Sequence, residues 1–127
     1  VRALTRDASM QVRAGAVEGL LRLGDISALS LAADLARHAD PTVRAAVAHA
    51  LAATSDKQSV AILHTLLQDQ QPQPRLFAAK ALGTNSAPVT PLLKKCLQDS
   101  DVAVRLAAAG SLLQQFHRST KTPNRQR

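Results

Sequence analysis

The stretch DSDVAVRLAAAGSL, residues 99–112, decides the fold, because close variants of it occur three more times upstream. The upstream copies are DASMQVRAGAVEGL at 7–20, HADPTVRAAVAHAL at 38–51 and DQQPQPRLFAAKAL at 69–82. The four copies align without gaps, and the arginines that they share lie 31, 31 and 30 residues apart. A period of this length predicts an array of helical repeats, each of which needs its neighbours to bury its apolar face.

Each copy predicts an amphipathic helix. When the residue before the arginine is counted as offset 0, apolar or small residues fill offsets 0, 3, 4, 7 and 8, which share one face of a helix. Further apolar segments at 29–36, 60–67 and 89–97 lie between the copies and predict a second helix for each unit. We call the helix that carries the arginine the inner helix and the one before it the outer helix.

The motif Asp-Pro-x-Val-Arg at 40–44, within this alternation of helices, resembles HEAT repeats, and most closely the short bacterial type of PBS-lyase-like repeats. The resemblance covers nearly the whole chain. It implies an all-α fold, a right-handed α-α superhelix of the HEAT/armadillo type with about four helical pairs, the first of them truncated. The family includes scaffolds, adaptors and a few enzymes, so the fold alone does not identify a ligand.

The expected solenoid domain covers residues 1–117, with repeats at about 1–24, 25–55, 56–86 and 87–117, followed by a basic, disordered tail at 118–127. Turn residues set the helix ends: Gly24 should end the first inner helix, and Asp40 should cap the second, with Pro41 at its first position. We expect inner helices at 9–23, 41–53, 72–82 and 101–117, and outer helices at 26–37, 57–68 and 88–98. The polar residues Gln114, Gln115 and His117 are expected to close the last repeat.

The chain begins inside what should be an outer helix, since residues 1–6 match only the last part of one. We therefore expect a C-terminal piece of a longer protein, whose other domains would be natural partners. The first inner helix then lacks a neighbour, and apolar surface around Val12, Leu20 and Leu23 should be exposed, with fraying or self-association as the consequence.

The net charge of +7 raises the question of a polyanionic partner. More than half of it comes from the tail, where Arg118, Lys121, Arg125 and Arg127 occur without any acidic residue. The rest of the chain is nearly balanced. The single cysteine, Cys96, fits a reducing, cytoplasmic compartment, no apolar run is long enough to span a membrane, and no signal peptide is visible, although the expected truncation leaves export open.

Paired charges recur with the repeats. An aspartate precedes the arginine by six residues in three copies, as Asp7 with Arg13, Asp69 with Arg75 and Asp99 with Arg105. In the second copy His38 takes that position and leaves Asp40 as the acid for Arg44. The resemblance implies that these residues form a structural ladder between repeats; the alternative is a row of arginines that binds a ligand.

The exposed side of the inner helices, at offsets 2, 5, 6 and 9, should line the concave surface of such a solenoid. This side is unexpectedly apolar, which favours an amphipathic helix or peptide as the partner. The candidate partner-binding residues are Val17, Glu18, Leu21, His49, Leu76, Lys80, Leu106 and Leu113. The alternative is that tight curvature buries the apolar ones against neighbouring repeats.

No pattern in the sequence indicates catalysis. Glu18, His49 and Lys80 share offset 6 and should form a row with about 10 Å between repeats, too far apart for a hydrogen-bonded catalytic triad. No phosphate-binding loop, nucleophile motif or metal-ligand spacing is present, so we expect no cofactor and no metal. The sequence predicts a noncatalytic protein-interaction or scaffold module of a larger protein. The alternative is binding of nucleic acid or another polyanion through basic residues and the C-terminal tail.

Overall fold

The computed structural model describes the backbone of residues 6–84 and 89–121 and the side chains of residues 12–84 and 89–117. This part of the chain is helical and contains no strand. Short 3-10 turns at Ile26–Ala28 and Leu51–Ala53 adjoin two of the helices. The α-helices are α1 (Arg6–Arg22), α2 (Leu29–Leu35), α3 (Pro41–Ala50), α4 (Lys57–Leu66), α5 (Pro72–Gly83), α6 (Thr90–Cys96) and α7 (Val102–Lys121).

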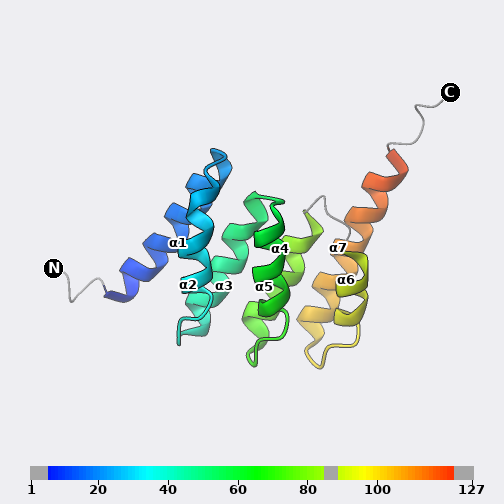
Figure 1. Ribbon diagram of the computed structural model, residues 1–127. Coiled ribbons are helices and arrows are strands. Elements are labelled where there is room, and N and C mark those ends of the chain that lie inside the picture. Colours follow the sequence, from blue (N-terminus) through cyan, green and yellow to red (C-terminus); the bar gives the residue numbers. More distant parts are fainter. Residues whose placement is uncertain (1–5, 85–88, 122–127) are drawn as a thin grey trace.

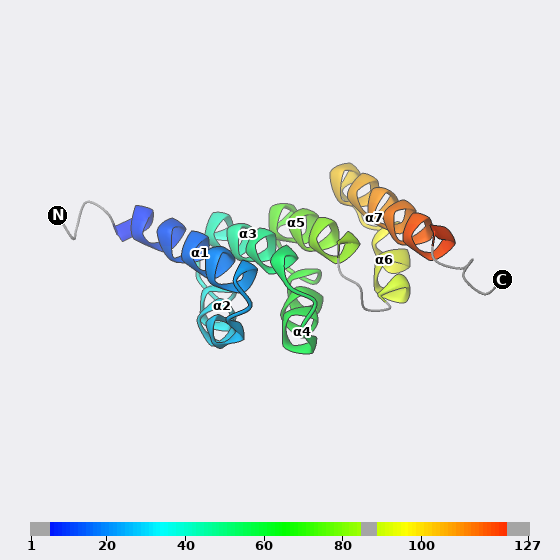
Figure 2. The ribbon, with the colours of Figure 1, turned by 90° about the horizontal axis from the view of Figure 1, so that it is seen from above.

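The helices form two layers (Figures 1 and 2). The inner helices α1, α3, α5 and α7 lie side by side in one layer and run in the same direction, and α2, α4 and α6 form the other. Each inner helix packs on the inner helix of the next unit, as α1 on α3, α3 on α5 and α5 on α7. The predicted all-α repeat solenoid is therefore confirmed.

Aspartate side chains start three of the helices. Asp40 Oδ1 accepts the Thr42 amide at 2.9 Å, with Pro41 in the first turn, as the sequence predicts. Asp56 and Asp101 cap α4 and α7 in the same way. These caps satisfy amide groups that have no partner within the helix.

Gly24 ends the first inner helix, again as predicted. Its φ of +87° is a left-handed conformation that a side chain would strain. The Asp25 amide then donates to the Leu20 carbonyl at 2.9 Å, which satisfies one of the free carbonyls at the helix end.

Two expected boundaries are wrong. The sequence predicts a turn at Asp7, but α1 already begins at Arg6 and continues through it, because neither proline nor glycine interrupts this stretch. The tail was expected to start at residue 118, but α7 runs to Lys121. The remainder of the expected tail and most of the 83–87 loop lie outside the described residues.

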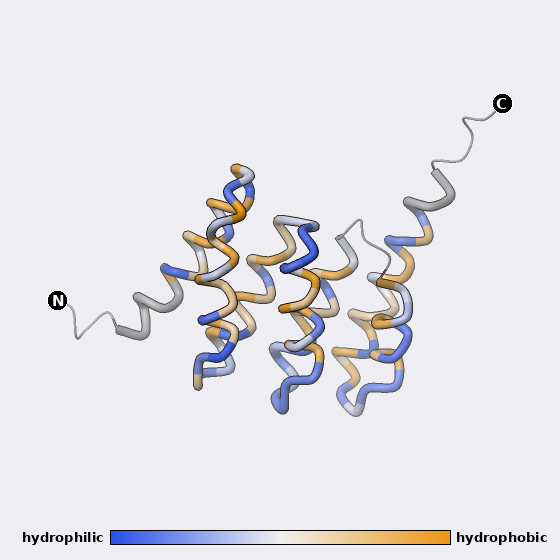
Figure 3. The backbone as a smooth tube through the Cα atoms, viewed as in Figure 1, coloured by the Kyte–Doolittle hydropathy of each residue, from blue (hydrophilic) through white to orange (hydrophobic). Residues whose placement is uncertain are grey.

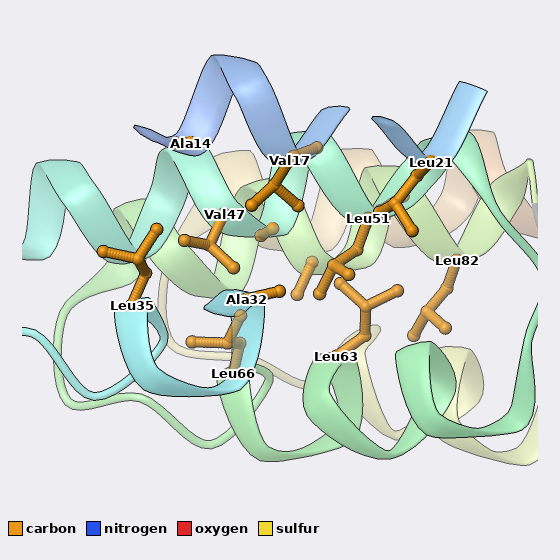
Figure 4. Packing of buried hydrophobic residues seen from close by; sticks show 14 of the residues in the cluster. Ala14, Val17, Leu21, Ala32, Leu35, Val47, Leu51, Leu63, Leu66 and Leu82 are labelled. Atoms are coloured by element: carbon orange, nitrogen blue, oxygen red, sulfur yellow. The ribbon is translucent and has the colours of Figure 1, made fainter. Parts of the chain in front are cut away.

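The core lies between the two layers. Leucines and valines from both layers are fully buried, including Leu51, Leu63 and Leu82. Figure 4 shows Val17 and Leu21 of α1 among them, close to Val47 and Leu51 of α3 and the following turn. In contrast, the turns that lead into α3, α5 and α7 lie together at one edge of the solenoid and are hydrophilic (Figure 3).

Candidate functional site

Two of the recurring arginines, Arg44 and Arg75, each tie their own unit to the next at this hydrophilic edge. Arg44 donates from Nε to Asp69 Oδ2 at 2.6 Å and from Nη2 to Asp69 Oδ1 at 2.9 Å. Its Nη1 donates to the His38 and Ala39 carbonyls of its own turn. One guanidinium therefore closes one turn and holds the next, as a bidentate geometry allows.

Arg75 repeats this arrangement one unit later. It donates from Nε to Asp99 Oδ2 at 2.9 Å and from Nη2 to Asp99 Oδ1 at 3.0 Å. Its Nη1 donates to the Asp69 carbonyl at 2.8 Å. The hydrogen bond from Arg44 lowers the pKa of Asp69 below its ordinary value. Burial is the largest single influence on Asp99 and opposes its ionisation, but the hydrogen bonds from Arg75 and the Asp101 amide, together with the charges of Arg75 and Arg105, lower its pKa as well.

The ladder is interrupted at both ends. His38 occupies the position that Asp69 and Asp99 hold in later units. Its Nδ1 accepts a hydrogen bond from the Asp40 amide at 3.0 Å, which stabilises the turn. An imidazole cannot, however, offer Arg13 a carboxylate. Arg13 is exposed. Asp40, predicted as a ladder acid, instead caps α3. The Asp7 side chain lies outside the described residues.

Arg105 shows the other incomplete rung. Its Nη1 donates to the Asp99 and Ser100 carbonyls at 2.8 and 3.3 Å, which closes its own turn. Among the described residues no carboxylate forms an ion pair with Arg105. The arginines thus act within the scaffold in the two complete rungs, rather than as an exposed row.

The structure corrects the predicted apolar surface. Val17 and Leu21 are buried, with 0% and 4% of their surface exposed, and Leu76 is half-buried against the last unit. Offsets 2, 5 and 9 therefore face the next inner helix. The alternative interpretation, burial against neighbouring repeats, is the correct one for the first three units.

Leu106 and Leu113 occupy the same offsets in α7 but are 68% and 64% exposed. No following unit covers them in the described part of the chain. They lie on the side of α7 that corresponds to the covered side of α5, and not in a concave groove.

The polar row at offset 6 lies on the solvent side of the inner helices, as the sequence predicts. His49 Nε2 approaches Glu18 Oε1 to 3.9 Å, and Arg22 Nη2 donates to Glu18 Oε2 at 2.8 Å. Lys80 is exposed, and its Nζ lies 5.6 Å from the centre of the Phe77 ring. The two long side chains of Glu18 and His49 reach toward each other across the spacing of about 10 Å that is expected between adjacent repeats.

An open groove of about 410 Å³ crosses α1, α3 and α5 beside this row. Its apolar part consists of small side chains and one aromatic ring, and its polar part includes both members of the Glu18–His49 pair. The groove is lined by Ala14, Gly15, Glu18, Thr42, Ala45, Ala46, His49, Gln73 and Phe77.

Of the groove residues, only Glu18 and His49 were among the predicted partner-binding residues, and Phe77 is the largest that sequence reasoning missed. It stands at offset 3, which the pattern assigns to the buried face, yet it is only half-buried and its ring meets the His49 ring edge-on at 6.1 Å between centroids. A signal was present, because the other copies carry only small residues at this offset, Gly15, Ala46 and Ala107.

Comparison with protein families agrees with this architecture. The family model for HEAT repeats matches residues 1–74 and 61–122. This chain belongs to the HEAT-repeat family. HEAT repeats generally mediate interactions between proteins and are typically noncatalytic scaffolds. A search of curated proteins found no match.

Other candidate sites in this HEAT-repeat chain are weak. Cys96 is buried, donates to the Leu92 carbonyl, and has its pKa raised by burial, so it is a core residue. Within the described side chains no group of three His, Cys, Asp or Glu residues is placed to hold a metal ion. None of the described helices has the length and apolar character required to cross a membrane.

Proposed function

We propose that this HEAT-repeat chain is a noncatalytic protein-interaction module that binds a helix or extended peptide in the groove across α1, α3 and α5. The observation that carries the proposal is the combination of a small-residue floor with a half-exposed phenyl ring. Ala45, Ala46 and Gly15 leave room for an apolar side chain of the partner, and Phe77 offers it a ring to pack on.

The charges around the groove favour a peptide of mixed polarity. Glu18 lies at one end beside Arg22, and Lys80 lies beyond Phe77 at the other. A partner with a basic residue near Glu18 and an acidic one near Lys80 would be oriented along the groove. The groove does not offer the several cations and stacking aromatics that a nucleic-acid site needs.

The test is a selection of peptides from a displayed random library against the whole chain, followed by binding titrations. Thr42→Trp places an indole in the groove at an exposed position, and Thr65→Trp makes the same change on α4, in the other layer. Selected peptides should bind the Thr65→Trp chain as they bind the wild type and lose at least tenfold in affinity for the Thr42→Trp chain. Equal affinity for both variants would contradict the groove as the binding site.

A further inference from the structure

The groove across α1, α3 and α5 places a histidine next to both a carboxylate and an aromatic ring. His49 lines the groove, and its Nε2 lies 3.9 Å from Glu18 Oε1. Its ring also meets the Phe77 ring edge-on, with 6.1 Å between the centroids and 89° between the planes. The His49 side chain is 62% exposed, so it can exchange protons with solvent. Histidine is the residue whose charge ordinarily changes between about pH 5 and 8.

Glu18 has one carboxylate oxygen engaged and one open. Oε2 accepts hydrogen bonds from Arg22, from Nε at 3.2 Å and from Nη2 at 2.8 Å. Oε1 accepts no hydrogen bond within the described residues, since its distance of 3.9 Å to His49 is too long for one. While the imidazole is neutral, Oε1 is therefore an acceptor that the groove offers to a partner.

The small side chains beside this oxygen leave room for a long one. Gly15 on α1 and Ala45 and Ala46 on α3 line the groove next to Glu18 and His49. Lysine and arginine bury their methylene groups along apolar surface and keep the charged end among polar groups. Such a side chain can lie over the small residues and bring its charged end to Glu18 Oε1.

The other charged groups that face His49 are both cations. Arg22 on α1 holds Glu18, and Lys80 on α5 has its Nζ 5.6 Å from the centre of the Phe77 ring. The remaining charged or titratable groups on helices packed against α3 occupy the repeat arginine position or belong to the other layer (Figure 2): Arg13, Arg44 and Arg75, and Asp34, Lys57 and His64. A protonated His49 would therefore add a third positive charge around a single carboxylate.

We propose that the groove binds an arginine or lysine side chain of its peptide partner at Glu18, and that protonation of His49 releases it. This rests on the protein-interaction function proposed above and adds the chemistry of the bound residue and its control by pH. The imidazolium is itself a cation beside Glu18, so it competes for Oε1 and repels the charge of the partner. Binding is stronger above the pH range in which histidine titrates and weaker below it.

The experiment uses peptides from the displayed library that bind the whole chain, that Thr42→Trp weakens and that contain no histidine. Their affinity is titrated at fixed ionic strength from pH 8 to pH 5. For the wild type it should fall by roughly three- to tenfold toward acid, the effect of two unit charges about 6 Å apart near a protein surface. Circular dichroism at each pH shows that the chain stays folded.

Two substitutions assign the pH dependence to one ring. His49→Gln keeps a polar side chain without the titratable group, and its affinity for the same peptides should not change with pH. His64→Gln is the matched control, at an exposed position on α4 in the other layer, and should keep the pH dependence of the wild type.

A second pair of changes tests the basic residue. Replacement of the arginine or lysine of the peptide by glutamine should weaken binding at pH 8 and remove the pH dependence. Glu18→Gln should have both effects on the unchanged peptide.

Three outcomes would overturn the proposal while leaving the groove as a binding site. They are groove peptides that contain no basic residue, a wild-type affinity that does not change with pH, and a loss of affinity in acid that persists in His49→Gln. If no selected peptide is weakened by Thr42→Trp, the proposed function itself fails, and this proposal fails with it.

Discussion

Arg75 and Asp99 are joined across two units by parallel hydrogen bonds, from Nε to Oδ2 at 2.9 Å and from Nη2 to Oδ1 at 3.0 Å. Both side chains are only 14% exposed. Arg105 makes the same bonds to its own turn but lacks the carboxylate. The two arginines therefore separate the contribution of the turn from that of the link between units.

Replacement of Arg75 by alanine should lower the free energy of unfolding by about 1.5–3 kcal/mol, because it leaves a partly buried carboxylate without its charged donor. Replacement of Arg105 by alanine should cost less, about 1 kcal/mol, since only bonds to carbonyls are lost. Urea unfolding of both variants at low protein concentration measures the difference. Equal losses would mean that the carboxylate adds nothing.

The Arg44–Asp69 rung should make stability depend on pH. The pKa of Asp69 is lowered in the folded chain, so the rung stabilises the fold fully above the ordinary carboxyl pKa and loses this effect as the pH falls through the folded value. Wild type and Asp69→Asn should therefore differ most in unfolding free energy near neutral pH, and the gap should close in acid. A gap that stays constant down to pH 2 would exclude a charged rung.

Substitution of His38 by aspartate should complete the missing rung. An aspartate there can accept the Asp40 amide as the imidazole does, and it adds a carboxylate for the exposed Arg13. We expect a gain of about 0.5–1.5 kcal/mol in thermal or urea unfolding at neutral pH. His38→Asn keeps the acceptor without the charge and should give no such gain; if it does, the ladder is not the cause.

Gly83 should not tolerate a side chain. It lies where α5 meets α7, and an added Cβ would come within 2.7 Å of the Ser111 Cβ and the Gln114 Oε1. Gly83→Ala should thus destabilise the fold by about 1–3 kcal/mol. Gly110→Ala, on an open part of α7, should stabilise it by about 0.5–1 kcal/mol through helix propensity. Relative to the wild type, the unfolding midpoint should fall for Gly83→Ala and rise for Gly110→Ala.

The tail allows a direct test of the polyanion alternative. Arg118, Lys121, Arg125 and Arg127 are replaced together by glutamine, and binding to duplex DNA is titrated across salt concentrations. Any affinity of the wild type should be weak, and the salt slope should fall by up to about 3.6 in the variant, since each of the four phosphate contacts contributes roughly 0.9. Tight, salt-dependent binding that survives the replacement would assign the DNA site to the solenoid instead.

The helical order could be predicted from the sequence because period and phase are local properties. Val43, Val47 and Leu51 recur at helical spacing, and Asp40 and Pro41 mark a helix start. Whether offsets 2, 5 and 9 of an inner helix face solvent or the next inner helix could not be predicted, since this depends on how sharply successive inner helices turn. Val17 and Leu113 are both apolar residues on this side of an inner helix, yet Val17 is buried and Leu113 exposed, because within the described residues only Val17 is covered by a following unit.

Part of the groove was nevertheless accessible from the sequence. The sequence places Glu18 and His49 of offset 6 on the exposed side of the inner helices, and both line the groove. It wrongly places offsets 2, 5 and 9 on the same exposed side, since these face the next inner helix in the first three units. The approach of His49 to Glu18 could not be predicted, because side-chain reach depends on the distance and tilt between α1 and α3.

The placement of the two complete rungs gives the array an uneven stiffness. Arg44 with Asp69 and Arg75 with Asp99 fasten consecutive units along one edge only, where the turns into the inner helices lie. At the opposite edge, the Thr84 hydroxyl donates a neutral hydrogen bond to the Ala52 carbonyl of the preceding unit. Bending that spreads the charged edge has to separate ion pairs, whereas bending that spreads the neutral edge does not. The solenoid should therefore bend most easily by opening its neutral edge, with the arginine edge acting as the hinge.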